Sequence, residues 1–139
     1  MAERFTDWRT ALNDYVHTVM PKLFVWGHHD CATFAAGAVL AMTGCDPAEK
    51  YRGRYKTLIG GLRLLRKDGF ENHAELAASQ FEEIHPSHAA VGDIAAVRID
   101  DSALWALGVV NGPRIFVLRP DASGLGTVDL LTAERAFRI

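Results

Sequence analysis

The chain has 139 residues, of which 49% are hydrophobic and 23% charged, proportions typical of one soluble globular domain. Its formal net charge is −2, so there is no general basic field of the kind that collects phosphates, and we expect no nucleic-acid partner. The amino-terminal residues do not resemble a signal peptide, and no apolar stretch is long enough to span a bilayer. We therefore expect a single domain over residues 1–139, made in the cytoplasm and without a membrane span.

Helical periodicity dominates the first half of the chain. Apolar residues at helical spacing predict a first helix that is capped by Thr6 and runs to about Met20, where Pro21 ends it. Residues 23–29 are predicted as a short extended approach to the next helix. Further helices are predicted over residues 31–43, about 56–66 and about 73–80, the last capped by Asn72.

Short strands separated by turn residues make up the second half. Gly92-Asp93 opens the first of them, and Asn111-Gly112 is the strongest short hairpin signal in the chain. The strands are predicted over residues 94–99, 103–110, 115–118, 127–130 and 136–139, with turns at 100–101 and 121–124. The last strand is expected at a sheet edge. Helices followed by antiparallel strands indicate an α+β fold with segregated layers.

The pair Asp30-Cys31 stands at the start of the most apolar predicted helix, which ends at Gly44. Asp30 is a strong N-cap residue, because its carboxylate can accept from the first free backbone N–H groups. Cys31 then occupies the first helical position, where those groups and the helix dipole favour a thiolate. The negative charge of Asp30 acts in the opposite direction and raises the thiol pKa. Cys31 is therefore a candidate nucleophile, with a packing role as the alternative, because free cysteines are often buried.

The second cysteine, Cys45, follows the other end of the same predicted helix, 14 residues from Cys31. At about 1.5 Å of rise per residue the two Cα atoms lie on the order of 20 Å apart, beyond the roughly 7 Å limit for a disulfide. We expect two free thiols and folding in a reducing compartment.

Histidines in two loops are candidates for a base that acts on Cys31. His29 immediately precedes Asp30, and His88 lies shortly before the predicted strand that Gly92-Asp93 opens. The alternative for both is a solvent-exposed loop residue. His28, His29, Asp30 and Cys31 are consecutive, so they cannot all turn to one ion, and we expect neither a metal nor another cofactor.

The order of these motifs resembles the NlpC-type papain-like cysteine peptidases. The resemblance rests on Asp30-Cys31 at a helix start, a helical middle, Gly92-Asp93 at a strand start, and the run 107–110 in the next strand. It implies a papain-like (NlpC-type) fold with N-terminal helices, a central Cys-bearing helix and a C-terminal antiparallel sheet. It also implies that Cys31 is the nucleophile of an enzyme that cuts stem peptides of the bacterial cell wall.

Two further features make the chain more similar to a narrower group. Trp26 precedes the Asp-Cys pair, and the chain ends in Arg-Ala-Phe-Arg-Ile over residues 135–139. With the Gly-Asp strand, these features resemble small proteins encoded among the tail genes of tailed phages and gene transfer agents.

The chain departs from the peptidase pattern at the catalytic histidine. Placing Leu107-Gly108-Val109 on the family's Val-Gly-Ile puts Ala106 where that histidine belongs. The residues before it, Leu104 and Trp105, cannot accept a proton either, and the Trp105 ring is expected to fill the former substrate groove. A thiolate without this partner lacks the general acid needed to expel the leaving amine.

The resemblance and this departure together imply a structural component of a phage or gene transfer agent tail. We expect it near the tail tip or hub of the virion, packed against other tail proteins, with little or no hydrolysis. The alternative is an active peptidoglycan endopeptidase that opens the cell wall for genome entry. It would use Cys31 with a histidine relocated to His29 or His88, or donated by a partner chain. An intracellular thiol hydrolase or amidase is a third possibility.

A basic cluster in the middle of the chain has two interpretations, a solvated helical face or a surface for an acidic protein partner. Its members are Arg52, Arg54, Lys56, Arg63, Arg66 and Lys67.

Overall fold

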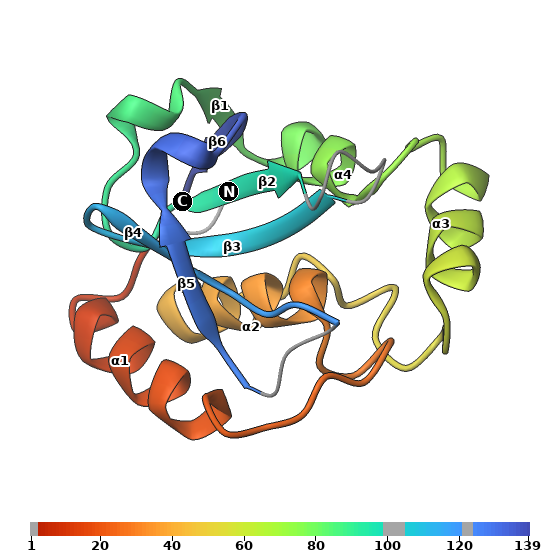
Figure 1. Cartoon of the computed structure of the whole chain (residues 1–139), viewed down its shortest axis with the longest axis horizontal. Helices are drawn as coiled ribbons and strands as arrows, with labels where there is room; N and C mark the ends of the chain where they lie inside the picture. Colours follow the sequence, from red (N-terminus) through yellow and green to blue (C-terminus); the bar gives the residue numbers. More distant parts are fainter. Residues whose placement is uncertain (1–2, 99–104, 121–123) are drawn as a thin grey trace.

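The structure is a computed structural model, and it describes residues 3–98, 105–120 and 124–139. Within these ranges the helices come first in the chain and the strands follow (Figure 1). The α-helices span Trp8–Val19 (α1), Cys31–Thr43 (α2), Leu58–Lys67 (α3) and His73–Gln80 (α4). The strands span Glu82–Ile84 (β1), Ile94–Arg98 (β2), Trp105–Asn111 (β3), Arg114–Val117 (β4), Gly126–Asp129 (β5) and Arg135–Arg138 (β6). Short 3-10 helices span Pro86–His88 (η1) and Leu130–Thr132 (η2).

The strands form one antiparallel sheet in the order β1-β6-β2-β3-β4-β5. This arrangement confirms the predicted α+β class with a C-terminal antiparallel sheet. The prediction that the last strand lies at an edge was wrong, because Phe137 of β6 pairs with Glu83 on one side and Ile94 on the other. The edge strand β1, which was not predicted, completes that side of the sheet.

Three local predictions also need correction. Thr6 does not cap the first helix, since α1 begins after Asp7, whose side chain makes no capping hydrogen bond. Residues 23–29 are not extended, because Gly27 takes φ +84° and reverses the chain into a Val25–His29 bridge. The β3–β4 hairpin exists, but its loop residues are 112–113, because the last strand pair joins positions 111 and 114. The turn predicted at 100–101 and most of that at 121–124 lie outside the described residues.

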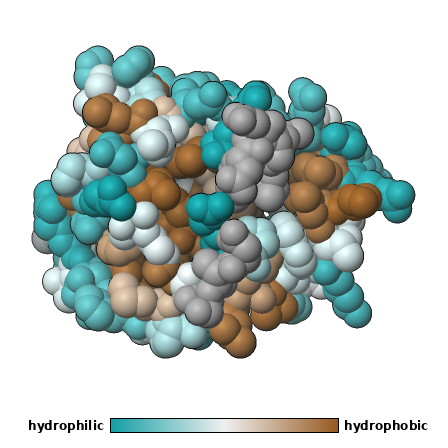
Figure 2. Space-filling model, in the orientation of Figure 1, coloured by the Kyte–Doolittle hydropathy of each residue, from teal (hydrophilic) through white to brown (hydrophobic). Residues whose placement is uncertain are grey.

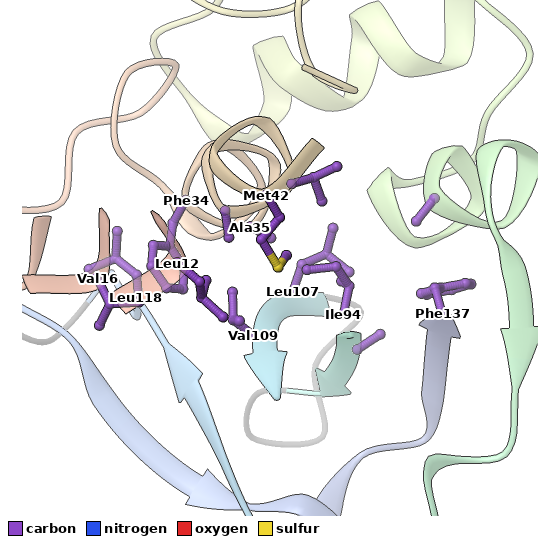
Figure 3. Packing of buried hydrophobic residues seen from close by; sticks show 14 of the residues in the cluster. Leu12, Val16, Phe34, Ala35, Met42, Ile94, Leu107, Val109, Leu118 and Phe137 are labelled. Carbon is purple, nitrogen blue, oxygen red and sulfur yellow. The ribbon is translucent and has the colours of Figure 1, made fainter. Parts of the chain in front are cut away.

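The most apolar helix, α2, is the centre of the fold, as its sequence predicted. Phe34 and Met42 of α2 are fully buried, and the helix packs against α1 and against β3. Leu12 and Val16 enter this core from α1, and Figure 3 shows them beside Phe34. Burying side chains of this size stabilises the fold by about 1.5–3 kcal/mol each before entropy costs. Leu107 and Val109 of β3 and Phe137 of β6 complete the same cluster.

The Gly92-Asp93 motif joins the two ends of the described chain. Asp93 is 3% exposed, and its carboxylate accepts from the Arg4 guanidinium at 2.9 Å and from the backbone N–H groups of Ala90 and Ile139. Arg4 also donates to the carbonyl oxygens of Val91 and Ile139. This carboxylate therefore holds the amino-terminal segment and the end of β6 against the start of β2, which is a structural role.

Replacing Asp93 by asparagine (Asp93→Asn) removes the charge that pairs with Arg4 and weakens an acceptor shared by several buried donors. We expect the free energy of unfolding to fall by about 2–4 kcal/mol, measured by equilibrium urea denaturation. The control is Glu134→Gln, which breaks the ion pair between Arg98 and Glu134, side chains that are 51% and 52% exposed. That change should cost less than about 1 kcal/mol. Equal losses in the two variants would contradict the role given to Asp93.

Candidate functional site

The buried carboxylate of Asp30 organises the amino end of α2. It accepts hydrogen bonds from the backbone N–H of Thr33 and of Gly27, both at 2.9 Å, and from the Tyr55 hydroxyl at 2.5 Å. The Thr33 hydroxyl in turn accepts from the Asp30 N–H at 2.8 Å, completing a capping box. The predicted N-cap role of Asp30 is confirmed, and its oxygens are committed to holding the helix end.

The loop before Asp30 closes against the segment that carries Tyr55. A Cβ atom at Gly27 would lie 2.1 Å from the Tyr55 carbonyl oxygen, and the left-handed φ of Gly27 also disfavours any larger residue. The Gly27 carbonyl accepts from the Gly53 N–H at 2.9 Å, which ties the same two segments a second time. Burial raises the pKa of Tyr55, and the charge of Asp30 raises it further, so the phenol stays protonated and donates.

Cys31 lies at the first position of α2, as predicted, but its thiol is enclosed. The residue is 5% exposed, and its Sγ lies 3.7 Å from the carbonyl oxygen of Trp105. Burial raises the pKa of the Cys31 thiol to about 12, and the charge of Asp30 adds to this, against the opposing backbone N–H of Leu107. The thiol is therefore neutral near pH 7, because burial outweighs the stabilisation that a helix amino terminus gives a thiolate.

The imidazole that lies beside this sulfur belongs to His73, which the sequence did not single out. Its Nε2 lies 3.9 Å from Cys31 Sγ and 2.5 Å from the Trp105 carbonyl oxygen. A carbonyl oxygen only accepts hydrogen bonds, so Nε2 must carry a proton and donate. Burial lowers the pKa of His73 and favours the neutral ring. In this arrangement the nitrogen facing the sulfur is a donor, so it cannot take the thiol proton.

The position of His73 follows from the way α4 is held. Asn72 caps α4 by accepting from the Glu75 N–H at 3.1 Å, which places His73 at the first helical position. Arg135 of β6 pairs with Glu75 at 2.5 Å and with Glu83 of β1 at 2.8 Å, fixing the helix against the sheet. The sequence carried one relevant signal, because His73 shares the inward face with positions 76 and 77 at i+3 and i+4 spacing.

Ala106, the residue predicted at the family's histidine position, is fully buried in the same apolar cluster as Cys31. Ala95 and Val110 belong to this cluster and are fully buried as well. Trp105 contributes its backbone carbonyl to the site, while its half-buried ring packs against the main core. The Arg98 guanidinium lies over that ring, 4.9 Å from its centre. The strand therefore contacts the sulfur through backbone groups, the Trp105 carbonyl oxygen and the Leu107 N–H.

The two candidate bases form no hydrogen bond with Cys31 in the described part of the chain. His29 is half-buried, packs edge-on against Phe34, and has a buried Nε2 without a hydrogen-bond partner among the described residues. Burial and the nearby Lys22 lower its pKa. His88 is exposed in η1, beside the ring of His85. Neither histidine is therefore positioned to accept the proton of the Cys31 thiol.

The remaining sequence candidates lie apart from the thiol. Cys45 is exposed and free, and Cys31 is free as well, which confirms the prediction of two unpaired cysteines. Arg52 does not offer a free charge to the predicted basic cluster, because it pairs with Asp46 at 2.5 Å and donates to the Thr33 carbonyl. Among the described residues no group of three or more His, Cys, Asp or Glu side chains is placed to hold a metal ion. No helix in those ranges has the length and hydrophobicity to cross a membrane.

A small pocket of about 50 Å³ lies beside Cys31. Asp30, Cys31 and His73 line it, and α3 contributes Leu58, Gly61, Leu62 and Leu65 to the lining. A much larger groove of about 1170 Å³ lies at the carboxyl end of α2, and neither Cys31 nor His73 lines it. Cys31 and His73 thus lie at the small pocket next to α3 and outside the large groove.

Comparison with known proteins gives a family and a fold. Residues 3–139 match the family described as "Domain of unknown function (DUF6950)". The chain belongs to this family. No curated protein matches it. The crystal structure of the NlpC/p60 domain of peptidoglycan hydrolase SagA is similar, with a TM-score of 0.58 over 94% of this chain and 97% of that one, at 14% identity. The predicted papain-like, NlpC-type fold is therefore confirmed.

The state of the thiol is testable by alkylation in a Cys45→Ser background, which removes the exposed cysteine. Because the thiolate is the reacting form, we expect Cys31 to react slowly with iodoacetamide at neutral pH, with a rate that rises about tenfold per pH unit well above pH 9. The pH–rate profile of the folded protein checks this. A plateau reached at or below pH 7 would mean a stabilised thiolate and would contradict the neutral, enclosed thiol.

Proposed function

We propose that this chain is a non-hydrolytic structural component of a phage or gene transfer agent tail, near the tail tip or hub. It uses an NlpC-type fold as a packing unit among other tail proteins, and its working location is the virion tail. The observation that carries the non-hydrolytic part is the enclosure of Cys31, which is 5% exposed. The expected place of Ala106 at the histidine position of the NlpC-type peptidases agrees with it.

Hydrolysis of a peptide bond by a cysteine needs three things that this geometry lacks. The thiolate is the nucleophile, yet the Cys31 thiol remains protonated near pH 7. A base must accept the thiol proton and later deliver it to the leaving amine, yet the nearest nitrogen of His73 already donates to Trp105. A substrate carbonyl must approach within about 3.5 Å of the sulfur, yet Cys31 is only 5% exposed.

The tail assignment is supported by the sequence resemblance to small proteins encoded among tail genes. Exposed apolar side chains are in keeping with a protein that packs against neighbours. Leu23 and Val25, on the loop before Asp30, are 66% and 50% exposed, and Ile59 of α3 is 64% exposed. The exposed basic residues of the middle segment, without Arg52, offer these neighbours a surface for acidic groups.

One observation favours a second candidate, an active peptidoglycan endopeptidase. His73 Nε2 lies within 4 Å of the sulfur, and catalytic hydrogen bonds often tighten only when substrate binds. In this candidate His73 replaces His29 and His88 as the relocated base. The ring must then release the Trp105 carbonyl and turn an unprotonated nitrogen toward the sulfur. A histidine donated by a partner chain is the other form of this candidate.

Purified protein incubated with peptidoglycan decides between these candidates. We expect no soluble stem-peptide fragments above the level given by the Cys31→Ala variant, as measured by mass spectrometry. Release that is lost in both Cys31→Ala and His73→Gln would establish the endopeptidase instead. The same assay is run on intact particles that carry either the wild-type protein or Cys31→Ala. Fragment release that occurs only with wild-type particles would indicate a histidine donated by a neighbouring chain.

The tail location is tested on particles from the strain that carries the gene. An epitope-tagged chain is expected to co-sediment with purified particles, and immunogold electron microscopy is expected to place the label at the tail tip. Head labelling with an antibody to the capsid protein serves as the positional control. Recovery only in the soluble lysate, with unlabelled particles, would remove the tail assignment while leaving the fold and the closed site unaffected.

A further inference from the structure

We propose that α3 is a lid over the Cys31–His73 pair, and that it opens locally while the rest of the domain stays folded. The thiol is then a cryptic group, enclosed in the resting protein and exposed when α3 swings away. This inference concerns the conformational behaviour of the site and does not depend on the tail assignment.

The geometry that points to a lid is the pocket beside Cys31. Its inner wall is the amino end of α2 with Cys31 and the amino end of α4 with His73. α3 contributes Leu58, Leu62 and Leu65 to the lining, beside Tyr51 and Tyr55 of the segment that precedes it. Figure 1 shows α3 at the edge of the molecule, away from the sheet, connected to both neighbours by loops. Moving this helix outward removes one wall of the pocket and disturbs no strand pairing.

The hold of α3 on the domain is weak. Leu65 is its buried residue, Leu58 and Leu62 are half-buried, and Ile59 is 64% exposed. Figure 2 shows hydrophobic surface at the end of the molecule where Figure 1 places α3. By contrast, most residues of α2 are buried. α3 therefore has fewer buried residues than α2, which is the property of a segment that opens at lower cost than the core.

The sequence of α3 also makes it a poor helix on its own. Adjacent glycines at positions 60 and 61 weaken it, because glycine loses the most conformational freedom on folding. A Cβ atom at Gly61 would lie 3.1 Å from the Tyr55 ring, so this ring packs closely on α3 and must separate from it on opening. A ten-residue helix of this composition depends on packing for its stability.

The ends of α3 supply hinges. Gly69 follows the helix with φ +91°, and no atom lies within 4 Å of the position a Cβ would take, so the chain can pivot there without collision. At the other end, Tyr55 stays bound to Asp30, and the exposed Lys56 and Thr57 separate it from the helix. One side-chain hydrogen bond must break on opening, from the Tyr51 hydroxyl to Asp68 at 2.6 Å.

Alkylation of Cys31 in the Cys45→Ser background measures the opening, with urea as the variable. A local opening exposes little surface, so the rate should be nearly independent of urea at low concentrations and should follow global unfolding only near the transition. Leu65→Ala removes the main apolar contact of the lid and is expected to raise the low-urea rate on the order of tenfold to a hundredfold.

The matched control is Leu12→Ala in α1, because Leu12 and Leu65 are both 7% exposed leucines. Leu12→Ala lowers global stability and should leave the low-urea alkylation rate within about twofold, since the two sites are independent. Equal acceleration by both variants, or a full urea dependence at all concentrations, would show that Cys31 is reached only through global unfolding and would overturn the lid.

Two further measurements keep the test decisive if Leu65→Ala does not fold. Leu62→Ala alters a half-buried lid residue and should accelerate alkylation in the same direction. Hydrogen exchange of the Cys45→Ser protein should show the α3 amides exchanging through a low-urea opening, while α2 amides exchange only on global unfolding. Uniform protection of α3 and α2 would overturn the proposal. None of these readouts uses peptidoglycan or particles, so their outcome is separate from that of the proposed function.

Discussion

The buried carboxylate of Asp30 is the interaction on which the local structure around the thiol depends. A buried carboxylate is tolerated only when hydrogen bonds replace the water that it loses, and here the donors come from three separate segments. They are the loop at Gly27, the first turn of α2 at Thr33, and the segment at Tyr55. The Asp30 carboxylate therefore caps the central helix. It also binds the reversed loop at Gly27 and the segment that leads into α3. The position of Cys31 is a consequence of this arrangement.

Two opposing effects act on the sulfur, and their balance decides its chemistry. The amino end of a helix favours a thiolate within its first turn, an effect worth about 0.3–1 kcal/mol when exposed. Removing a charge from water costs several times more, and the neighbouring carboxylate adds repulsion. At Cys31 the effect of burial is the larger one, so the thiol pKa is raised and the thiol donates toward a backbone carbonyl. Proximity of an imidazole does not change this, because the same carbonyl fixes the proton on the nitrogen that faces the sulfur.

Some features encoded within a few residues were predictable from the sequence, although the Thr6 cap and the extended conformation of residues 23–29 were predicted wrongly. Features that depend on distant pairing were not predictable. Asp30 and Asn72 were identified as caps because an N-cap needs only one side chain and the next three backbone N–H groups. The place of β6 depends on pairing with β1 and β2, about fifty and forty residues earlier, which no local pattern reports. His73 was missed for the same reason, since its contact with Cys31 spans 42 residues. The helical spacing of His73 indicated that the side chain is buried, but it did not indicate which residue the side chain contacts.

The packing around Ala106 bears on the proposal that this fold does not hydrolyse peptide bonds. The alanine methyl is fully enclosed in a cluster with Cys31, Ala95 and Val110, so no space is kept for an imidazole at this position. Inserting a larger side chain into such a core forces neighbouring side chains or backbone to move, at a typical cost of about 1–3 kcal/mol. The close packing that stabilises the strand beside the thiol thus leaves no room for a larger side chain at position 106. The histidine that does lie beside the sulfur, His73, comes from the amino end of α4 and not from the sheet.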